Sequence, residues 1–584
     1  MRKTKIICTI GPASQEKEVL RELFERGLNV ARLNFSHGNH EEHKERIDTI
    51  KEISEELGMS VAIMLDTKGP EIRTRRFNKP EILLEEGKPF TITTRDIVGD
   101  ETIGSVTYEE LCNDVVPGNT ILIDDGLIEL EVLEVQDTEI KCLIKNTGIV
   151  KDNKGINVPG VKIKLPAITE RDRNDIIFGI EQGIDFIAAS FVRKSEDVLA
   201  IREILEAHNA ADIQIISKIE NQEGVNNIEK IIEVSDGIMV ARGDLGVEIP
   251  TEQIPLVQKT IIKACNAVGK PVVTATQMLD SMMRNPRPTR AEVTDVANAI
   301  FDGTDAIMLS GETAAGKYPR EAVKTMANIA MSAEESLDYK AILREKAVGK
   351  ENSITDAVSH ATCNTAQDLG ASGIITATSS GYTARMVSKF RPKAPIIVAT
   401  TSEKVMRRMA IIRGAYPVLV ESGHSTDEVF DLSVKKSLKA GLIKSGDLVI
   451  ITAGVPVGIA GTTNTIKVHV VGDVVVRGAG VGKKSVVGKV CIVNNAQEAA
   501  EKFKEGDILV AVGTDKDMVP YMKEASAIIV EAGGLTSHAA IVGLHFEKPT
   551  IVGALDATKV LKDGDTITVD TLRGLVYIGK ATVL

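Results

Sequence analysis

The sequence predicts an α/β protein built on a TIM (β/α)8 barrel, a closed ring of parallel strands surrounded by helices. Two observations predict this fold. Short apolar runs, typical of buried strands, alternate with helical segments through the first 344 residues. Most of these runs end in polar or charged residues, and TIM barrels carry their active sites at that end of the strands. The eight runs are TKIICTIG, NVARLNFS, VAIMLDT, DFIAASFV, IQIISKIE, GIMVARGD, PVVTATQ and AIMLSGE.

One interval between two of these runs is too long to be a simple helical crossover. Residues 71–166 contain short β-like runs and turns such as PGNT and DDGL, without a helical period. We interpret them as a small inserted β-barrel domain that follows the third strand, so the barrel itself comprises residues 1–70 and 167–344. A domain inserted at the active face of a barrel is suited to act as a lid.

Two further domains are predicted after the barrel. Residues 345–473 restart the alternation of strand and helix, in SGIITATSSGYTARMVSKF, PIIVATTS and DLVIITAGVPVG, which indicates a separate α/β domain. A Gly- and Val-rich stretch, GDVVVRGAGVGKKSVVGKV, then leads into a small domain over residues 477–584.

Composition limits the function. The 584 residues include 70 Lys and Arg and 82 Asp and Glu, for a formal net charge of −12. An acidic balance argues against nucleic-acid and membrane-surface partners. No apolar run reaches the roughly 18–20 residues that span a bilayer, and we expect no signal peptide. The six cysteines form no CxxC pair, which indicates reduced thiols and a cytoplasmic protein.

The most informative stretch is QIISKIENQEG, in which Lys218 and Glu220 follow an apolar run. Side chains alternate along a strand, so these two point to the same face at its C-terminal mouth. The next run ends in Arg242, Gly243 and Asp244. Two strand ends therefore offer two carboxylates to one divalent cation, with an ammonium group beside it. The alternative for Lys218 and Glu220 alone is a surface ion pair.

Oxygen-bearing side chains follow two other runs. In NVARLNFSHG, the positions i, i+2 and i+4 hold Arg32, Asn34 and Ser36 on one face, and Asp66 and Thr67 end the next run. Amide, hydroxyl and carboxylate oxygens of this kind form a weak-field cage that suits a large monovalent cation. The alternative is a set of polar residues that only closes the mouth of the barrel.

Arginine and threonine side chains complete the predicted mouth of the barrel. Arg32 and Arg73 can each grip a phosphate with two hydrogen bonds. Thr276 ends the seventh run, where a lone threonine is most often structural. The segment from Pro286 to Gly303 predicts a barrel helix, with Thr289 as N-cap, Glu292 completing a capping box, and apolar residues at Val293, Val296, Ala297 and Ile300.

Several long motifs resemble those of the pyruvate kinase family and occur in the same order. They are MLDTKGPEIR, ISKIENQEG, MVARGDLG, TATQMLDSM, RPTRAEVTDVANA and MLSGETAAG. The resemblance covers roughly residues 1–473. It implies transfer of a phosphoryl group from phosphoenolpyruvate to ADP, giving pyruvate and ATP in the last step of glycolysis.

The resemblance also implies metal ligands. Glu220 and Asp244 would hold Mg²⁺ or Mn²⁺, with phosphoenolpyruvate completing its shell. The K⁺ site would consist of Asn34, Ser36, Asp66 and Thr67. Glu71 stands where, in this family, glutamate accompanies K⁺ dependence and lysine accompanies independence. We therefore expect the activity to require K⁺.

Substrate and catalytic roles follow from the same resemblance. Arg32 would bind the phosphate of phosphoenolpyruvate, while Gly243, Asp244 and Thr276 would line its carboxylate end. Arg73 and Lys154 would contact the nucleotide phosphates, near Asn34 and His37. The catalytic set is Lys218, Arg32, Arg73 and Thr276. Lys218 would neutralise the transferred group and the enolate, and Thr276 would lie on the route of the proton to carbon.

A loop in the third domain is a candidate anion site. In TATSSGYTARMVSKF, hydroxyl groups of Thr378, Ser379, Ser380 and Thr383 surround Gly381 at a predicted helix N-terminus. The alternative is a plain capping turn. The resemblance implies an allosteric site for a phosphorylated effector, AMP or a sugar phosphate, and it suggests a homotetramer.

The last domain carries GGLTSHAAIVG, which resembles the phosphohistidine loop in the mobile domain of phosphoenolpyruvate-utilising enzymes. His538 stands at the position of the histidine that carries phosphate there. The arginine that commonly follows in those enzymes is absent, and Gly543 takes its place. Two interpretations stay open: a structural or regulatory domain, and live phosphotransfer through His538.

Three other functions compete with the kinase. A metal-dependent aldolase of pyruvate enolate uses a similar barrel and a Glu/Asp metal site, but it requires neither the lid nor the K⁺ cage. A non-enzymatic sensor predicts a damaged site, yet the six key side chains are present. A phosphocarrier that works through the last domain would depend on His538. The six key side chains that argue against a damaged site are Arg32, Arg73, Lys218, Glu220, Asp244 and Thr276.

Overall fold

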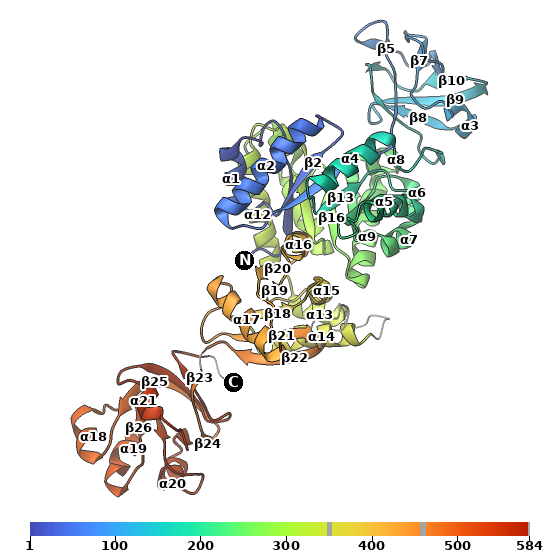
Figure 1. Cartoon of the computed structure of the whole chain (residues 1–584). Coiled ribbons are helices and arrows are strands. Elements are labelled where there is room, and N and C mark those ends of the chain that lie inside the picture. The colour runs from blue at the N-terminus through green and yellow to red at the C-terminus, as the bar shows by residue number, and fades with distance from the viewer. Residues whose placement is uncertain (347–352, 456–462, 473, 582–584) are drawn as a thin grey trace. The chain divides into compact units, whose positions relative to one another are not determined.

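The computed structural model describes residues 1–346, 353–455, 463–472 and 474–581 (Figure 1). The chain divides into two compact units. The first joins Met1–Ile342 with Ser402–Tyr416, and the second joins Leu343–Thr401 with Pro417–Leu584. Residues 402–416 therefore pack with the first unit, although they lie inside the predicted third domain.

A closed barrel of eight parallel strands forms the centre of the first unit. Its strand order around the ring is β1-β17-β16-β15-β14-β13-β3-β2, so the ring closes between the first and last strands. All eight predicted runs are strands of this barrel, which confirms the predicted fold. The bounds are β1 (Lys5–Thr9), β2 (Val30–Asn34), β3 (Ala62–Asp66), β13 (Phe186–Ala189), β14 (Gln214–Ile219), β15 (Gly237–Ala241), β16 (Val272–Ala275) and β17 (Ala306–Leu309).

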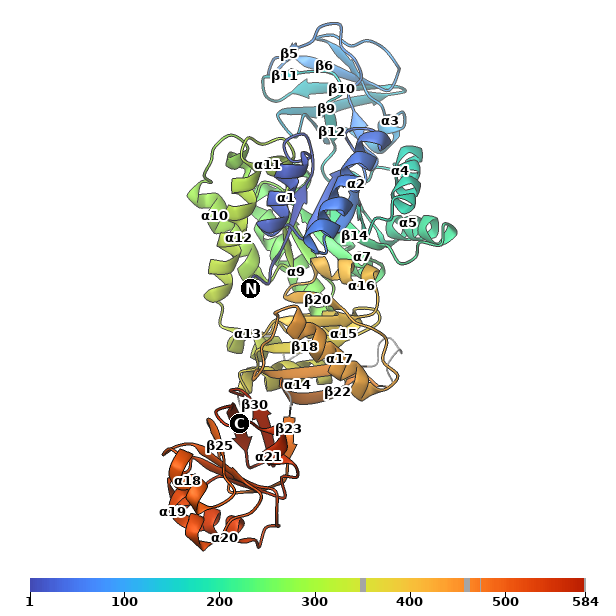
Figure 2. The same cartoon turned by 60° about the vertical axis from the view of Figure 1, so that its left-hand side comes forward.

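Helices surround the barrel (Figure 2). The outer ring includes α1 (Lys17–Glu25), α2 (His40–Leu57), α4 (Glu170–Glu181), α5 (Ser195–Ala207), α7 (Ile228–Val234), α9 (Ile254–Val268), α10 (Arg290–Asp302) and α12 (Pro319–Glu335). Short helices α6 (Gln222–Asn226), α8 (Arg242–Glu248) and α11 (Gly311–Ala314) follow β14, β15 and β17 directly.

Helix α10 shows how local sequence sets a helix end. Thr289 and Glu292 form the predicted capping box, and Gly303 ends the helix with a φ of 100°. A residue with a side chain rarely adopts this left-handed conformation, so glycine suits the position. The predicted apolar face is only partly buried, because Val293 is 36% exposed.

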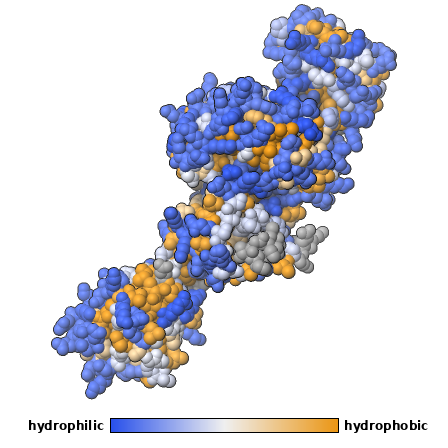
Figure 3. All heavy atoms as spheres, viewed as in Figure 1, coloured by the Kyte–Doolittle hydropathy of each residue, from blue (hydrophilic) through white to orange (hydrophobic). Residues whose placement is uncertain are grey.

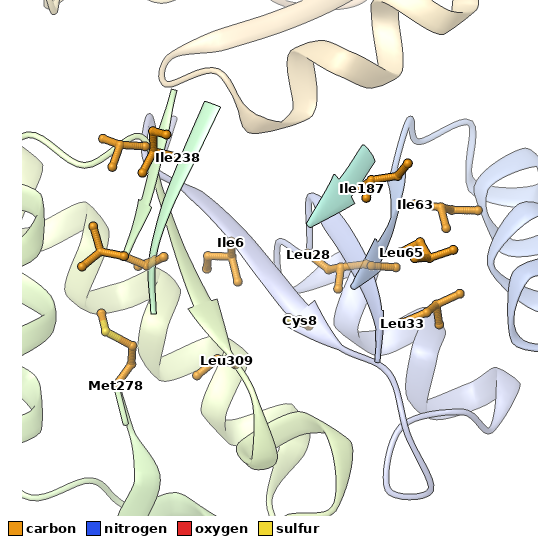
Figure 4. Packing of buried hydrophobic residues seen from close by; sticks show 14 of the residues in the cluster. Ile6, Cys8, Leu28, Leu33, Ile63, Leu65, Ile187, Ile238, Met278 and Leu309 are labelled. Carbon is orange, nitrogen blue, oxygen red and sulfur yellow. The ribbon is translucent and has the colours of Figure 1, made fainter. Parts of the chain in front are cut away.

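The barrel strands and the surrounding helices share one apolar core (Figure 4). Ile6, Leu33, Leu65 and Ile187 are fully buried in it. Burying a side chain of this size contributes about 1.5–3 kcal/mol relative to leaving it exposed. The packed core fixes the strand ends, and therefore the side chains that the active face carries.

The inserted segment forms a largely antiparallel sheet of seven strands, in the order β4-β12-β8-β9-β10-β6-β7, and a separate pair, β11-β5. It has its own core, which includes Ile92, Leu130 and Ile140. The bounds are β4 (Ile72–Arg73), β5 (Ile82–Leu84), β6 (Pro89–Thr93), β7 (Ile103–Ser105), α3 (Leu111–Asp114), β8 (Thr120–Ile123), β9 (Ile128–Gln136), β10 (Glu139–Ile144), β11 (Gly148–Val150) and β12 (Gly155–Asn157).

The second unit contains a five-stranded sheet, in the order β20-β19-β18-β21-β22. Its strands are β18 (Gly373–Ala377), β19 (Ile396–Thr400), β20 (Ala415–Leu419), β21 (Leu448–Gly454) and β22 (Thr463–Val470). The helices of this part are α13 (Tyr339–Lys346), α14 (Ile354–Asp368), α15 (Tyr382–Lys389) and α17 (Thr426–Lys439), and α16 (Glu403–Arg408) lies in the segment that packs with the first unit.

The C-terminal part forms an eight-stranded sheet, in the order β23-β30-β29-β25-β26-β27-β28-β24. Hydrophobic residues remain on its surface, as Figure 3 shows, and Leu535, Leu544 and Leu555 are each more than 60% exposed. Its elements are β23 (Val474–Arg477), β24 (Ala479–Val481), β25 (Ser485–Ile492), α18 (Ala496–Lys502), β26 (Ile508–Ala511), α19 (Val519–Glu524), β27 (Ala527–Val530), α20 (His538–His545), β28 (Thr550–Val552), α21 (Ala557–Val560), β29 (Thr566–Asp570) and β30 (Leu575–Ile578).

None of the helices within the described ranges is long and apolar enough to cross a membrane.

Candidate active site

A buried carboxylate, Asp66, connects the predicted phosphate and catalytic cations. Arg32 Nε donates to Asp66 Oδ2 over 2.6 Å, and Lys218 Nζ donates to Oδ1 over 3.1 Å. Burial opposes ionisation of Asp66, but the charges of Arg32 and Lys218 outweigh it and hold the pKa of Asp66 below its ordinary value. Asp66 is therefore an anion that fixes two cations at the mouth of the barrel.

Lys218 lies between two carboxylates and a hydroxyl group. Its Nζ is 2.9 Å from Glu220 Oε1 and 2.8 Å from Ser190 Oγ, in addition to its bond with Asp66. Burial lowers the pKa of Lys218, but Asp66 and Glu220 outweigh burial and raise this pKa above its ordinary value. Lys218 is thus a fixed, permanently charged donor, as the alternation along β14 predicted.

Glu220 is a buried carboxylate next to a second acid. Burial raises the pKa of Glu220 to about 7, Lys218 opposes this shift, and Asp244 adds to it. The backbone N–H of Phe191 donates to Glu220 Oε2 over 2.6 Å and orients the group. Glu220 and Asp244 repel each other when both are ionised, and a cation bound between them would relieve this repulsion.

Thr276 has an unusual backbone conformation next to Gly243. Its φ is 67°, which a β-branched residue adopts only under strain. The Thr276 hydroxyl accepts a hydrogen bond from the Gly243 N–H over 2.6 Å and donates to the Ala275 carbonyl over 2.6 Å. The strand ends of β15 and β16 are therefore tied together where the resemblance places the substrate carboxylate.

A cleft of about 620 Å³ lies between the inserted sheet and the barrel, within the first unit. It brings together three predicted site residues, Arg73, Lys154 and Asp244, with Glu71. Arg73 Nε donates to Glu71 Oε2 over 2.7 Å, and Lys154 Nζ donates to Asp124 Oδ1 over 2.9 Å. Both cations are thus held at the cleft by carboxylates and are suited to bind phosphate oxygens.

The donor sets fit the metals that the sequence predicts. Glu220 and Asp244 follow neighbouring strands, β14 and β15, and their mutual repulsion suits a divalent ion. Within the described ranges no group of three or more His, Cys, Asp or Glu side chains forms a metal site. Two protein carboxylates would therefore leave most of the shell to substrate and water.

The oxygens of the predicted K⁺ site lie on adjacent strands. Asn34 of β2 is the register partner of Asp66 of β3. Asn34 Oδ1 accepts the Ser36 N–H over 3.1 Å, and the Thr67 hydroxyl lies 3.4 Å from the Ala188 carbonyl. Neutral oxygens around a single carboxylate suit a monovalent cation.

Comparisons with known proteins decide the family. The family model described as "Pyruvate kinase, barrel domain" matches residues 1–323, and "Pyruvate kinase, alpha/beta domain" matches residues 356–469. The chain belongs to the pyruvate kinase family. A third model, "PEP-utilising enzyme, mobile domain", matches residues 503–574, as the resemblance around His538 predicted.

Pyruvate kinases similar to this chain come from several bacteria. The protein named "Pyruvate kinase" from Bacillus licheniformis is 58% identical over 586 aligned positions, and that from Geobacillus stearothermophilus is 57% identical over 585. Both comparisons cover 100% of each chain. The crystal structure of a pyruvate kinase from Cryptosporidium parvum is 43% identical, with a TM-score of 0.77, and covers 80% of this chain and 96% of its own.

The pyruvate kinase α/β domain carries the predicted effector loop. Gly381 has a φ of 81° and precedes α15, while Thr378 Oγ1 accepts the Gly381 N–H over 3.0 Å. Ser380 Oγ lies 3.4 Å from the Tyr382 N–H, and Thr383 Oγ1 lies 2.8 Å from Thr463 Oγ1. The loop has the local turn that the sequence predicted. The hydroxyl groups of Thr378 and Ser380 bond within this turn, whereas that of Thr383 bonds to Thr463 of β22.

His538 is exposed at the start of α20, and its Nδ1 lies 2.9 Å from Thr514 Oγ1. Gly543, which replaces the common arginine, is buried in the same helix. A Cβ atom at this position would lie 2.1 Å from Thr550 Oγ1, so no side chain fits without rearrangement. The loop therefore keeps the histidine but has no room for the arginine that accompanies it elsewhere.

Sequence reasoning missed several side chains in and near the site. Ser190 binds Lys218 and also donates to the Thr67 carbonyl over 2.6 Å. Asn157 of the inserted sheet donates to Glu248 of α8 over 2.8 Å. Ser190 directly follows β13 within the run DFIAASFV, and a polar residue at this place was a signal available in the sequence. Asn157 and Glu248 carry no comparable signal, because their contact joins segments far apart in the chain.

Proposed function

We propose that this chain transfers the phosphoryl group of phosphoenolpyruvate to ADP in the cytoplasm, giving pyruvate and ATP in the last step of glycolysis. One observation carries the proposal. Lys218 is fixed between Asp66 and Glu220, at 3.1 and 2.9 Å, where it can face charge on a transferred phosphoryl group. Phosphoryl transfer needs positioned cations more than covalent catalysis, and this arrangement supplies one.

Each end of phosphoenolpyruvate has its own set of residues in this proposal. Arg32 binds the phosphate, and Gly243, Asp244 and Thr276 line the carboxylate. Lys218 donates to the phosphoryl oxygens and then to the enolate oxygen that remains. The enolate takes a proton on carbon by a route along Thr276.

The nucleotide lies on the lid side of the cleft. Arg73 and Lys154 bind its phosphates, and Asn34 and His37 lie near the same edge. Both cations already line one cleft with Asp244, which supports this placement. Closure of the lid excludes water, so that phosphate passes to ADP.

The proposed cofactors are Mg²⁺ or Mn²⁺ and K⁺. Glu220 and Asp244 hold the divalent ion, and Asn34, Ser36, Asp66 and Thr67 hold K⁺. When bound, these ions neutralise the negative charge of the phosphates and fix their orientation.

The test is pyruvate formation from phosphoenolpyruvate and ADP with Mg²⁺, measured with K⁺ and with Na⁺ at equal ionic strength. We expect turnover that depends on ADP and on K⁺. Turnover without K⁺ would contradict the proposed K⁺ site but would leave the assignment as a kinase unchanged. Cleavage of phosphoenolpyruvate at a rate that does not depend on ADP would contradict the assignment as a kinase.

We propose the domain limits that the sequence predicts: 1–70 and 167–344 for the barrel, 71–166 for the lid, 345–473 for the effector domain and 477–584 for the last domain. The family models, over residues 1–323, 356–469 and 503–574, support this division. We also propose a homotetramer, which light scattering on the purified chain would test.

Glu71→Lys should remove the need for K⁺. Glu71 lies 2.7 Å from Arg73 in the cleft, and a lysine ammonium there would supply the missing positive charge itself. We expect turnover in Na⁺ buffer to rise at least about tenfold relative to wild type, equal to a barrier change of roughly 1.4 kcal/mol. Glu86→Lys, the same charge change on the exposed lid, is the matched control. A K⁺ requirement unchanged in Glu71→Lys would contradict the assignment.

The effector loop should bind AMP or a sugar phosphate. In the Thr378→Ala/Ser380→Ala variant, we expect the ratio of turnover with effector to turnover without it to fall to one, because both hydroxyl groups are lost. Ser425→Ala, which removes the N-cap hydroxyl of α17 in the same domain, is the control. Activation that survives in the double variant would disprove this site.

His538 is the candidate phosphate carrier, and the missing arginine favours a structural or regulatory role for its domain. In live transfer, the P–O bond of phosphoenolpyruvate would break, an N–P bond to the imidazole would form, and the enolate would take a proton. We expect no acid-labile label after incubation with ³²P-phosphoenolpyruvate. A label that His538→Ala loses and His545→Ala keeps would instead establish His538 as a carrier.

A further inference from the structure

The end of β2 and the loop that joins it to α2 carry three residues proposed as ligands: Asn34, the last residue of β2, and Ser36 and His37 in the loop. The backbone of the loop is held at several points. The Phe35 N–H donates to the Asp66 carbonyl over 3.0 Å, and Arg171 donates to the Phe35 carbonyl over 2.8 Å. A further contact comes from a side chain that has no role in the proposed function.

That side chain is His43, on the first turn of α2. It is 1% exposed, and its ring stacks on Phe35 with centroids 3.9 Å apart and planes 11° apart. Its Nε2 lies 2.9 Å from the His37 carbonyl oxygen. One ring therefore contacts the loop twice, once at the Phe35 side chain and once at the His37 backbone.

The protonation state of His43 follows from its partners. A carbonyl oxygen only accepts, so Nε2 must carry the hydrogen. Its Nδ1 is buried and has no hydrogen-bond partner among the described residues. Burial lowers the pKa of His43 to about 4, because the interior solvates the charged ring poorly, and this effect outweighs the hydrogen bond to His37, which favours the charged form. The ring is a neutral donor with one fixed tautomer.

His40, one turn earlier on the same helix, provides a comparison. Its Nε2 lies 2.6 Å from Asp175 Oδ1, and its ring stacks on Phe178 of α4 at 4.3 Å. Its side chain is 43% exposed. His40 thus anchors α2 to α4 and reaches the loop only by a tilted contact with Phe35, with ring centroids 6.2 Å apart. His43 stacks directly on Phe35 and alone of the two also contacts the His37 carbonyl.

We propose that His43 is a positioning residue that holds the loop so that Asn34 and Ser36 reach K⁺ and His37 reaches ADP. It touches neither ligand and acts through the His37 carbonyl and the Phe35 ring. The inference rests on the proposed function. It goes beyond that function by naming what fixes the loop.

Two substitutions separate the two contacts. His43→Phe keeps a stacking ring and removes the donor, while His43→Gln keeps a donor and removes the ring. His40→Gln is the matched control on the same helix. ADP affinity is measured by calorimetry with Mg²⁺, and K⁺ binding by the rise of the unfolding temperature with K⁺ concentration.

We expect His43→Phe to weaken ADP and K⁺ binding about fivefold, the factor that one neutral hydrogen bond is worth. His43→Gln should weaken both by about twofold. The KM for phosphoenolpyruvate should change less than twofold, because Asp66, and not the loop, fixes Arg32 and Lys218. If His43→Phe fails to fold, Phe35→Leu replaces it. This variant removes the ring on which His43 stacks, so it tests the same contact from the side of the loop.

Two results would overturn the inference. One is a folded His43→Phe variant that binds ADP and K⁺ with wild-type affinity. If His43→Phe does not fold, wild-type affinity in Phe35→Leu counts in its place. The other is an equal loss in His40→Gln. The wild-type chain separates this inference from the proposed function. If the wild-type chain turns over without K⁺, the proposed K⁺ site is wrong, and ADP binding alone decides the role of His43. If the wild-type chain binds neither K⁺ nor ADP, the proposed function and the role of His43 are both wrong.

Discussion

Replacing Lys218 by Met should lower turnover by about 10³-fold, the largest effect expected from a single side chain here. The substitution removes the cation that the proposed function places against the transferred phosphoryl group, and one donor of this kind is worth about 10²–10³ in rate. It also leaves Glu220 without the ammonium that now lies 2.9 Å away. Breaking a buried ion pair costs about 3–5 kcal/mol of stability. Steady-state kinetics and thermal unfolding measure the two effects separately.

Lys259→Met is the matched control for this substitution. Lys259 pairs with Asp302 on the surface of the same barrel, and its side chain is 59% exposed. Lys259 lies on α9, a helix that surrounds the barrel, and not at the strand ends that carry the site, so turnover should stay within about twofold of wild type. A Lys218→Met enzyme that keeps more than a tenth of wild-type turnover would contradict the role given to Lys218.

Replacing Glu220 by Gln should raise the Mg²⁺ concentration for half-saturation at least about 100-fold. Substitution of residues that only hydrogen-bond to a metal ligand typically lowers metal affinity by about 10–100-fold, so substitution of a ligand itself should lower the affinity at least as much. The amide oxygen of glutamine can still accept the Phe191 N–H, so the fold should persist. Mg²⁺ titrations of turnover measure the shift. Glu248→Gln, at the cleft that Asp244 also lines, is the control.

The pH dependence gives a second readout for Glu220. Burial raises its pKa to about 7, and only the ionised carboxylate binds a metal. In wild type, apparent Mg²⁺ affinity should therefore be constant above about pH 8 and fall up to about tenfold per pH unit below 7. In Glu220→Gln this dependence should flatten. An equally steep dependence in the variant would show that another group titrates.

The barrel and its central pair of residues were predictable because each signal is local. Apolar runs with polar ends mark the strands, and alternation along β14 places Lys218 beside Glu220. The positive φ angles of Thr276 and Phe191 were not predictable, because surrounding structure imposes them. The position of Ser190 after an apolar run was visible in the sequence, but its partners Asp66 and Lys218 were not, because they come from two other strands.

Contacts between distant segments also escaped prediction. Arg407 Nε donates to Asp185 over 2.8 Å, and Arg408 donates to Asp212 over 2.7 Å. These pairs help to place residues 402–416 with the barrel, although the neighbouring sequence continues the strand–helix alternation of the α/β domain. Periodicity reports which face of an element is buried, but not which distant element covers it.

The most direct test of phosphoryl transfer at this site is phosphorus NMR of phosphoenolpyruvate and ADP mixed with the enzyme, Mg²⁺ and K⁺. The proposed function predicts that the phosphoenolpyruvate signal falls while the γ-phosphate signal of ATP rises one for one. Lys218→Met should show neither change on the same timescale. Release of inorganic phosphate in place of ATP, or unchanged transfer in Lys218→Met, would contradict the account.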